Sequence, residues 1–191
     1  MDEQQEVRDP AQSNRTIFDR MIGAATFNVP TYEEVEADET LTGQAAAVVL
    51  LATVARMIGG AEGGMSPMLA GLFAALSMWL IWAGITYLIG DKLLGGTATW
   101  GELLRTLGFA QAPGVLAVVG AFGPLSGITE AVVSIWLLFT GIIAIRQALD
   151  FGTGKAILTA FLGWLVAMAA VVLLGLSWGG LATMTGSGGG G

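Results

Sequence analysis

The sequence predicts an all-α, polytopic membrane protein with five transmembrane helices, and three observations support this fold class. Of the 191 residues, 54% are hydrophobic. Only 12% are charged, whereas soluble domains carry roughly 25% charged residues. Five long apolar runs follow one another, and glycine- or proline-containing segments separate them. The runs cover about residues 41–58, 67–90, 104–123, 128–146 and 156–177.

The lengths of the apolar runs match the thickness of a bilayer. A spanning helix needs about 20 mostly apolar residues. Four runs meet this length, and the 18 residues from Leu41 to Ile58 nearly do. Buried helices of a soluble protein are the alternative, but such helices normally keep a polar face. We therefore expect a five-span transmembrane domain over residues 41–178 and a flexible, Gly/Ser-rich tail over residues 179–191.

Residues 1–40 form an acidic head before the first run. The head holds ten acids and three bases, whereas the rest of the chain holds five of each. From Thr16 to Ala25 the apolar residues, Phe18 and Met21 among them, recur at helical spacing. This pattern predicts a short amphipathic cytoplasmic helix on the membrane surface. Because an acidic head does not bind anionic lipid by charge, we expect the apolar face near Phe18, or a protein partner, to attach it.

Two segments show the capping-box pattern, in which Thr is followed three residues later by Glu. Thr31 and Glu34 predict the start of a second short helix within the head. Thr99 and Glu102 predict a helix start just before the third apolar run.

The basic residues predict the orientation in the membrane. With a cytoplasmic N-terminus, seven of the eight Lys and Arg residues lie on the cytoplasmic side, and Arg56 is the exception. Cytoplasmic loops are enriched in Lys and Arg. We therefore expect an N-in topology that is C-out after five spans.

The residue types that most enzymes need are scarce. The chain has no Cys and no His, so it lacks thiolate nucleophiles and the commonest general base and metal ligand. No basic patch suits a nucleic acid, and no carboxylate or base lies in the middle of a predicted span. We expect no enzymatic activity, no catalytic or metal-binding residues, no cofactor, no nucleic-acid partner and no small-molecule substrate.

The third apolar run contains the most notable polar residue, Gln111, two positions before Pro113. A proline frees a backbone carbonyl, and a nearby amide can bond to it. One interpretation is a locally hydrogen-bonded kink, and the other is a polar niche for a lipid head or a partner helix. Gly108 belongs to a series of small residues in the same run, which permit close helix packing in lipid. That packing lies either within one bundle or between subunits.

Charged residues gather at the predicted cytoplasmic face. Arg146 and Asp150, four residues apart, form an ion pair if the helix continues that far. The cluster is either a solvated set of ion pairs or a docking surface for a cytoplasmic partner or lipid headgroups. Its members are Asp91, Lys92, Glu102, Arg105, Arg146, Asp150 and Lys155.

Four tryptophans fall near the middle of the predicted spans, so they do not fit the aromatic belts of a membrane protein. They form either one packed aromatic layer or separate packing contacts. They are Trp79, Trp82, Trp136 and Trp164.

Several of these segments together resemble the Yip-domain family of small polytopic membrane proteins, in its bacterial branch. The resemblance rests on residues 90–96, 100–113, 144–150 and 154–158, and it covers about residues 15–178. It implies five spans and a cytoplasmic N-terminus. Eukaryotic members bind small Rab-type GTPases and act in vesicle traffic, but their signature Asp-Leu-Tyr-Gly-Pro does not occur here before the first span. The resemblance therefore implies the fold more than a function.

These observations favour a non-catalytic scaffold, assembly factor or accessory subunit of a larger membrane complex, located in the bacterial inner membrane. Its expected partners are the lipid bilayer and other integral membrane proteins, or further copies of the chain. The alternative is a small permease, a lipid-handling protein or a channel subunit.

Overall fold

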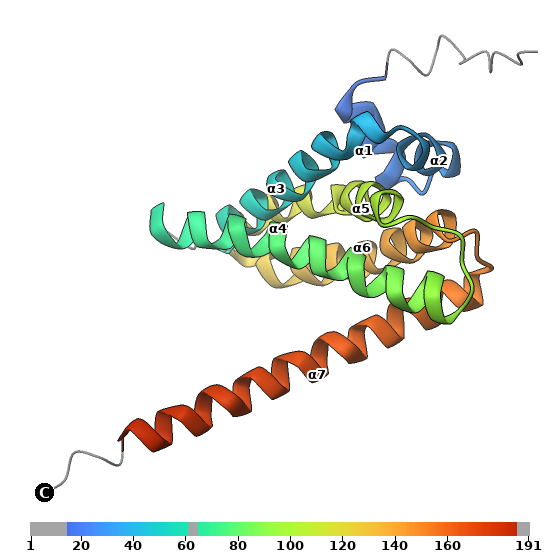
Figure 1. The fold of residues 1–191 in the computed structure, drawn as a ribbon. Coiled ribbons are helices and arrows are strands. Elements are labelled where there is room, and N and C mark those ends of the chain that lie inside the picture. The colour runs from blue at the N-terminus through green and yellow to red at the C-terminus, as the bar shows by residue number, and fades with distance from the viewer. Residues whose placement is uncertain (1–14, 61–64, 187–191) are drawn as a thin grey trace, which may run out of the picture.

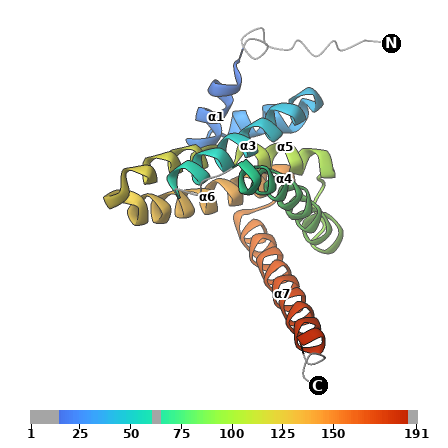
Figure 2. The ribbon, with the colours of Figure 1, turned by 90° about the vertical axis from the view of Figure 1, so that its left-hand side faces the viewer.

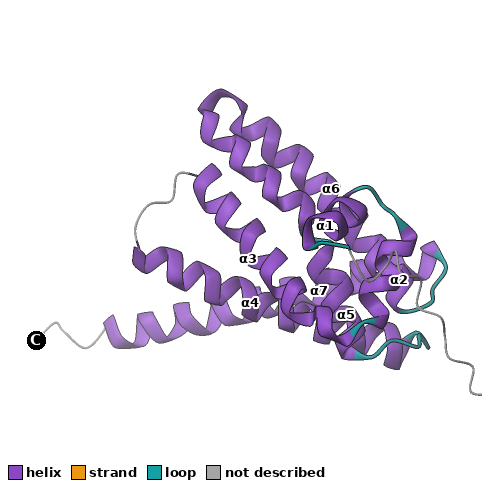
Figure 3. Cartoon of the chain, turned by 90° about the horizontal axis from the view of Figure 1, so that it is seen from above, coloured by secondary structure: helices purple, strands orange, loops and turns teal. Residues whose placement is uncertain are grey.

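A computed structural model describes residues 15–60 and 65–186. Throughout these residues the chain is helical or in loops, and no strand occurs among them (Figure 3). The all-α prediction is thus confirmed for the described part of the chain. In order, the helices are α1 (Ile17–Ala25), α2 (Val29–Ala37), η1 (Glu39–Leu41), α3 (Thr42–Gly59), α4 (Met65–Tyr87), η2 (Leu88–Leu93), α5 (Trp100–Phe109), η3 (Ala112–Leu125), α6 (Ser126–Ala148) and α7 (Thr153–Gly186).

Three continuous helical stretches of the described chain are long and apolar enough to cross a membrane. They are Glu39–Gly59, Pro67–Leu93 and Trp100–Ala148. A shorter apolar helix covers Thr153–Ala169. The third stretch contains two of the predicted runs. They are separated at Phe122 and Gly123, where the backbone leaves helical geometry and Gly123 has φ 54°. Glycine reaches positive φ without steric cost. The chain turns back there, so η3 and α6 lie side by side (Figure 1).

Small residues form the contact between α3 and the α5–η3 segment. A Cβ atom added to Gly108 would lie 2.7 Å from the Cβ atom of Ala45. A Cβ atom added to Gly114 would lie 2.9 Å from that of Ala52. Because real Cβ atoms do not approach so closely, the absence of a side chain lets the two backbones meet. The close packing that the sequence predicts therefore lies within one chain at this face.

The last helix stands apart from the others. Figure 2 shows α7 extending away from α3–α6. Its buried positions among residues 153–169 are Ala156, Thr159 and Gly163, which share one helix face. The helix ends at Gly186, so residues 179–186 continue α7, whereas the sequence assigned them to a flexible tail. The remaining tail, residues 187–191, lies outside the described residues.

Of the two capping boxes that the sequence predicts, the structure confirms one and contradicts the other. The capping box of Thr99 and Glu102 is confirmed at the start of α5. The one expected at Thr31 is wrong, because α2 begins two residues earlier, at Val29. The side chain of Asn28 is its N-cap and accepts a hydrogen bond from the Thr31 amide. This frees the Glu34 side chain to form ion pairs.

A backbone carbonyl close to Pro113 is bonded by a threonine from another helix. The Thr140 hydroxyl of α6 donates to the Ala110 carbonyl at 2.8 Å. The Thr140 carbonyl in turn accepts a bond from the Tyr32 hydroxyl at 3.4 Å. The expectation that Gln111 bonds to this carbonyl is therefore wrong. Thr140 and Tyr32 are both fully buried, so this network joins α2, α5 and α6 inside the core.

Replacing Thr140 with valine should destabilise the protein by about 1–3 kcal/mol, because the buried Ala110 carbonyl loses its donor while the shape of the side chain is kept. The thermal unfolding midpoint in detergent measures this effect. Thr140→Ser keeps the hydroxyl and should retain most of the stability. Equal midpoints for Thr140→Val and the wild type would contradict the assignment of this bond.

Candidate functional site

Arg105 fixes the head to the transmembrane helices. It projects from α5 and is only 5% exposed. Its Nε atom donates to the carbonyl oxygens of Val35 at 2.8 Å and of Glu36 at 3.1 Å, and its Nη2 atom also donates to Glu36. These carbonyls belong to the last turn of α2. A cation at a helix C-terminus satisfies its free carbonyls and interacts favourably with the helix dipole. Arg105 is thus an internal cap and not an exposed docking residue.

A second arginine joins the head to α3. Arg20 on α1 is 6% exposed and pairs with the Glu34 carboxylate of α2 at 2.8 Å. It also donates to the Gln44 side chain of α3 at 3.2 Å. Arg15 pairs with the other oxygen of Glu34 at 2.7 Å. One carboxylate therefore holds two arginines, and the pair with Arg20 is shielded from solvent.

The end of α1 is held by aromatic side chains. The Trp136 indole of α6 donates to the Ala25 carbonyl at 2.8 Å. The Tyr32 hydroxyl donates to the Ala24 carbonyl at 3.0 Å. Because Trp136 lies near the middle of α6, α1 packs alongside that helix and not beyond its end. The head is therefore attached to the chain's own helices, which is neither of the two attachments expected from the sequence.

The predicted amphipathic helix is present as α1, but its two candidate interaction residues have different environments. Met21 is 8% exposed and belongs to the core. Phe18 and Ile22 are 65% and 64% exposed. Since they are four residues apart, they share one outward helix face. Only this Phe18 face remains available to a membrane or a partner.

The predicted charge cluster is brought to one end of the bundle, with different pairings from those expected. Asp150 lies beyond the end of α6 and accepts a hydrogen bond from Thr97 at 2.8 Å. Arg146 bonds to Gln147, its neighbour in the sequence, at 3.1 Å. The expected Arg146–Asp150 pair is therefore wrong, because the helix ends at Ala148, before it reaches Asp150.

The other charged side chains of the cluster form one ion pair and two hydrogen bonds with backbone groups. Lys92 pairs with the adjacent Asp91 at 2.6 Å. Lys155 donates to the Leu94 carbonyl at 3.2 Å. Glu102 accepts a bond from the Thr99 amide at 2.7 Å. Within the described residues, no group of three or more acidic side chains is placed to hold a metal ion.

Leu149 joins two of the segments that suggested the family resemblance. A Cβ atom on Gly90 or Gly96 would lie 2.3 or 2.6 Å from a methyl carbon of Leu149. The leucine is 1% exposed and fits between these glycines. The glycines before and after Asp91 and Lys92 therefore serve close packing of η2 and its following loop against the end of α6.

Glu36 occupies an unfavourable electrostatic position next to the Arg105 cap. Partial burial, together with the negative charges of Glu102, Asp150 and Glu33, raises the pKa of this carboxyl to about 7, against the opposing effect of Arg105. Glu36 therefore holds a proton more tightly in the folded protein than in the unfolded chain, where a glutamate has a pKa of about 4.3.

Docking of α2 should weaken as the pH rises from about 4.5 to 7, because the folded state binds more protons than the unfolded state in this range. The loss becomes constant about one pH unit above the folded pKa, near pH 8. We expect it to be about 1 kcal/mol, since solvent screens a half-exposed carboxylate. Unfolding midpoints between pH 5 and 8 measure this dependence. Glu36→Gln should flatten this part of the profile, and an unchanged slope would contradict the assignment to Glu36.

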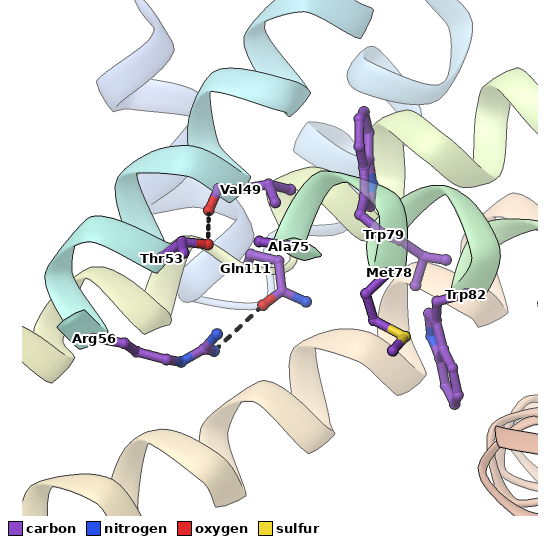
Figure 4. A pocket seen from close by; sticks show the side chains of 9 residues that line it. Val49, Thr53, Arg56, Ala75, Met78, Trp79, Trp82 and Gln111 are labelled. Atoms are coloured by element: carbon purple, nitrogen blue, oxygen red, sulfur yellow. Dashed lines mark hydrogen bonds between the residues drawn. The ribbon is translucent and has the colours of Figure 1, made fainter. Parts of the chain in front are cut away.

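A pocket between α3, α4 and α5 contains the predicted polar residue Gln111 (Figure 4). Its volume is about 320 Å³. The Arg56 Nη2 atom of α3 donates to the Gln111 side-chain oxygen at 3.5 Å. We call this the Arg56 pocket, and its lining residues are Val49, Thr53, Arg56, Ala75, Met78, Trp79, Trp82, Leu107 and Gln111.

The four mid-span tryptophans do not form one aromatic layer. Trp79 and Trp82 line the Arg56 pocket, and the Trp79 indole donates to the Leu104 carbonyl at 3.0 Å. Trp136 caps α1, as described above. Trp164 is 51% exposed and stacks on Phe161, with ring centroids 6.3 Å apart. They act as separate packing and hydrogen-bonding residues, which is one of the two interpretations of the sequence.

Comparison with protein families agrees with this arrangement. The model of the Yip1 domain matches residues 24–175, which include α2 to α6 and much of α7. The chain belongs to the Yip1 domain family. No match was found among curated proteins or among solved structures. The Yip1 domain match begins within α1, so it includes α2 and the Arg105 cap as well as the apolar helices. The Yip1 domain and the long apolar helices together identify a membrane protein.

Proposed function

We propose that this Yip1 domain protein is a non-catalytic, five-span membrane scaffold or accessory subunit with a rigid cytoplasmic end. One observation carries the proposal: buried hydrogen bonds from Arg105 and Trp136 fix the head onto the transmembrane helices. A head held in this way is a preformed surface, and preformed surfaces lose less entropy when they bind a partner.

Five spans and an N-in, C-out orientation form part of this proposal. The Arg105 cap brings the head to the end of the bundle where the loops around Thr97 and Asp150 meet. Gly59 of α3 contacts Gly120 of η3 at the other end. The helices α3, α4, α5–η3 and α6 run alternately between the two ends, and α7 then extends away from the bundle (Figure 1). Reporters fused to the C-terminus should be active outside the cytoplasm, and activity confined to the cytoplasm would contradict the orientation.

The proposed docking surface consists of the exposed residues around the charge cluster. Lys92, Asp150 and Lys155 are exposed, and Leu93 and Trp100 beside them are 75% and 47% exposed. Exposed apolar side chains next to charges are typical of interaction sites. Other integral membrane proteins, or a second copy of the chain, are the proposed partners, and the bacterial inner membrane is the proposed location.

Site-specific photocrosslinking in native membranes tests this proposal. A photoreactive residue at position 92 or 155 should give one crosslinked species of defined mass. Lys155→Glu should abolish it when the probe is at position 92, and Lys92→Glu should abolish it when the probe is at position 155. The matched control places the photoreactive residue at Leu69, an exposed apolar position of α4. If positions 92, 155 and 69 give the same products, the proposed docking surface is wrong.

The alternative function, a permease, lipid-handling protein or channel subunit, is supported by the Arg56 pocket alone. The pocket is lined by three of the helices, α3, α4 and α5.

A further inference from the structure

The Arg56 guanidinium has few interaction partners in the protein around it. Arg56 is half-buried on the apolar helix α3. Among the described residues its guanidinium has one hydrogen bond, at 3.5 Å, and no carboxylate lies within ion-pair distance. Arginine keeps its proton in proteins. Arg56 lies in the last turn of α3, near the predicted headgroup region, and a half-buried charge there is costly unless it has a partner.

The polar end of the pocket presents mainly hydrogen-bond donors. The Gln111 oxygen accepts from Arg56, and its amide nitrogen donates to no residue that the structure describes. The Thr53 hydroxyl donates to the Val49 carbonyl at 2.8 Å, so only its acceptor lone pairs remain. A guanidinium and an amide nitrogen next to each other select an anionic oxygen ligand, and above all a phosphate.

The opposite wall of the pocket is apolar and faces outward. Trp79, Trp82 and Met78 of α4 form this wall (Figure 4). Met78 is 55% exposed, and its neighbour Ile81 on the same helix is 54% exposed. In a membrane these side chains meet hydrocarbon. The pocket therefore joins a cationic end to a wall that suits an acyl chain, which fits an amphiphile better than a free anion.

We propose that the Arg56 pocket binds one anionic phospholipid, with its phosphate at Arg56 and Gln111 and an acyl chain along Met78 and Trp82. The site requires no solute pathway and no protein partner. It therefore stands independently of the scaffold function proposed above.

Native mass spectrometry of the full chain in detergent tests this proposal. The protein should retain one phosphatidylglycerol molecule about tenfold more strongly than phosphatidylcholine, because the quaternary ammonium of phosphatidylcholine neutralises its own phosphate and is repelled by Arg56. Arg56→Gln should remove this preference. The matched control, Arg146→Gln, changes a partly buried arginine outside the pocket and should keep it. Equal retention of phosphatidylglycerol by Arg56→Gln and the wild type would overturn the proposal.

Three further arms identify the ligand and its partner residue. Ala75→Leu narrows the apolar wall without changing the charge, so it should weaken phosphatidylglycerol binding, and unchanged binding would overturn the acyl-chain assignment. Inorganic phosphate at millimolar concentration should not displace the lipid, and displacement would instead identify a free-anion site.

Glu62, six residues after Arg56, lies outside the described residues. Glu62→Gln should keep the preference for phosphatidylglycerol, and a preference that appears only in this variant would show that Glu62 is the native partner of Arg56.

Discussion

Replacing Arg105 with methionine should detach α2 from the transmembrane helices. The variant keeps most of the side-chain volume but leaves the buried carbonyls of Val35 and Glu36 without donors. Each carbonyl left without a donor costs about 1–3 kcal/mol, so the two together should cost about 4 kcal/mol. We expect amide hydrogen exchange in α2 to become at least 100-fold faster, because opening of this region becomes less costly by a similar free energy.

The matched control for this experiment is Arg146→Met. Arg146 is partly buried, and its side chain bonds to Gln147, its neighbour in the sequence. Its loss should change stability by about 0.5 kcal/mol or less. Arg105→Lys should give an intermediate result, because one ammonium group cannot reproduce the fork of the guanidinium. Exchange in α2 that stays slow in Arg105→Met would show that the other contacts of the head hold it without the Arg105 cap.

The contrast between Arg105 and the apolar runs shows which parts of the structure local sequence patterns can predict. Hydropathy locates the long helices because a helix that crosses the bilayer must be apolar along most of its length. The cap at Thr99 needs only two residues that are three positions apart. Arg105, by contrast, bonds to backbone carbonyls about 70 positions earlier in the chain. Carbonyls carry no side-chain signal, so the sequence suggests a surface charge where the structure has a cap.

The candidate site was predictable to a similar, limited extent. Gln111 stands out in the sequence because it is polar in an apolar run, and the structure places it in a pocket. Its partner Arg56 is 55 positions away, in the last turn of α3, so no local pattern links the two residues. Thr140 was not singled out, because a threonine in a membrane helix normally bonds to its own preceding turn. Only the packing of α6 on α5 brings it to the Ala110 carbonyl. A buried hydroxyl near a proline kink is the signal that could have found it.

Gly59 provides the second large effect that we expect. A Cβ atom at this position would lie 2.1 Å from the carbonyl oxygen of Ala117 and 3.0 Å from its carbonyl carbon. Because both atoms belong to backbone, no side chain can rotate away, and α3 must separate from η3. Gly59→Ala should therefore destabilise the protein by about 3 kcal/mol. The corresponding fall in the unfolding midpoint in detergent is about 6–12 °C for a chain of this size.

Gly141→Ala is the matched control, because no heavy atom lies within 4 Å of a Cβ atom built there. Alanine favours a helix over glycine by about 0.5–1 kcal/mol, so this variant should be at least as stable as the wild type. Equal effects of the two substitutions would mean that α3 and η3 are farther apart than the structure shows.

The dependence of the stability on protein concentration decides whether the glycine contact lies within one chain or between two copies. A loss in Gly59→Ala that is the same at all concentrations places the glycine contact within one chain, because only an interface between copies follows mass action. Partners in a complex must then use other surfaces, of which the exposed residues around Lys92 and Lys155 are the ones we propose.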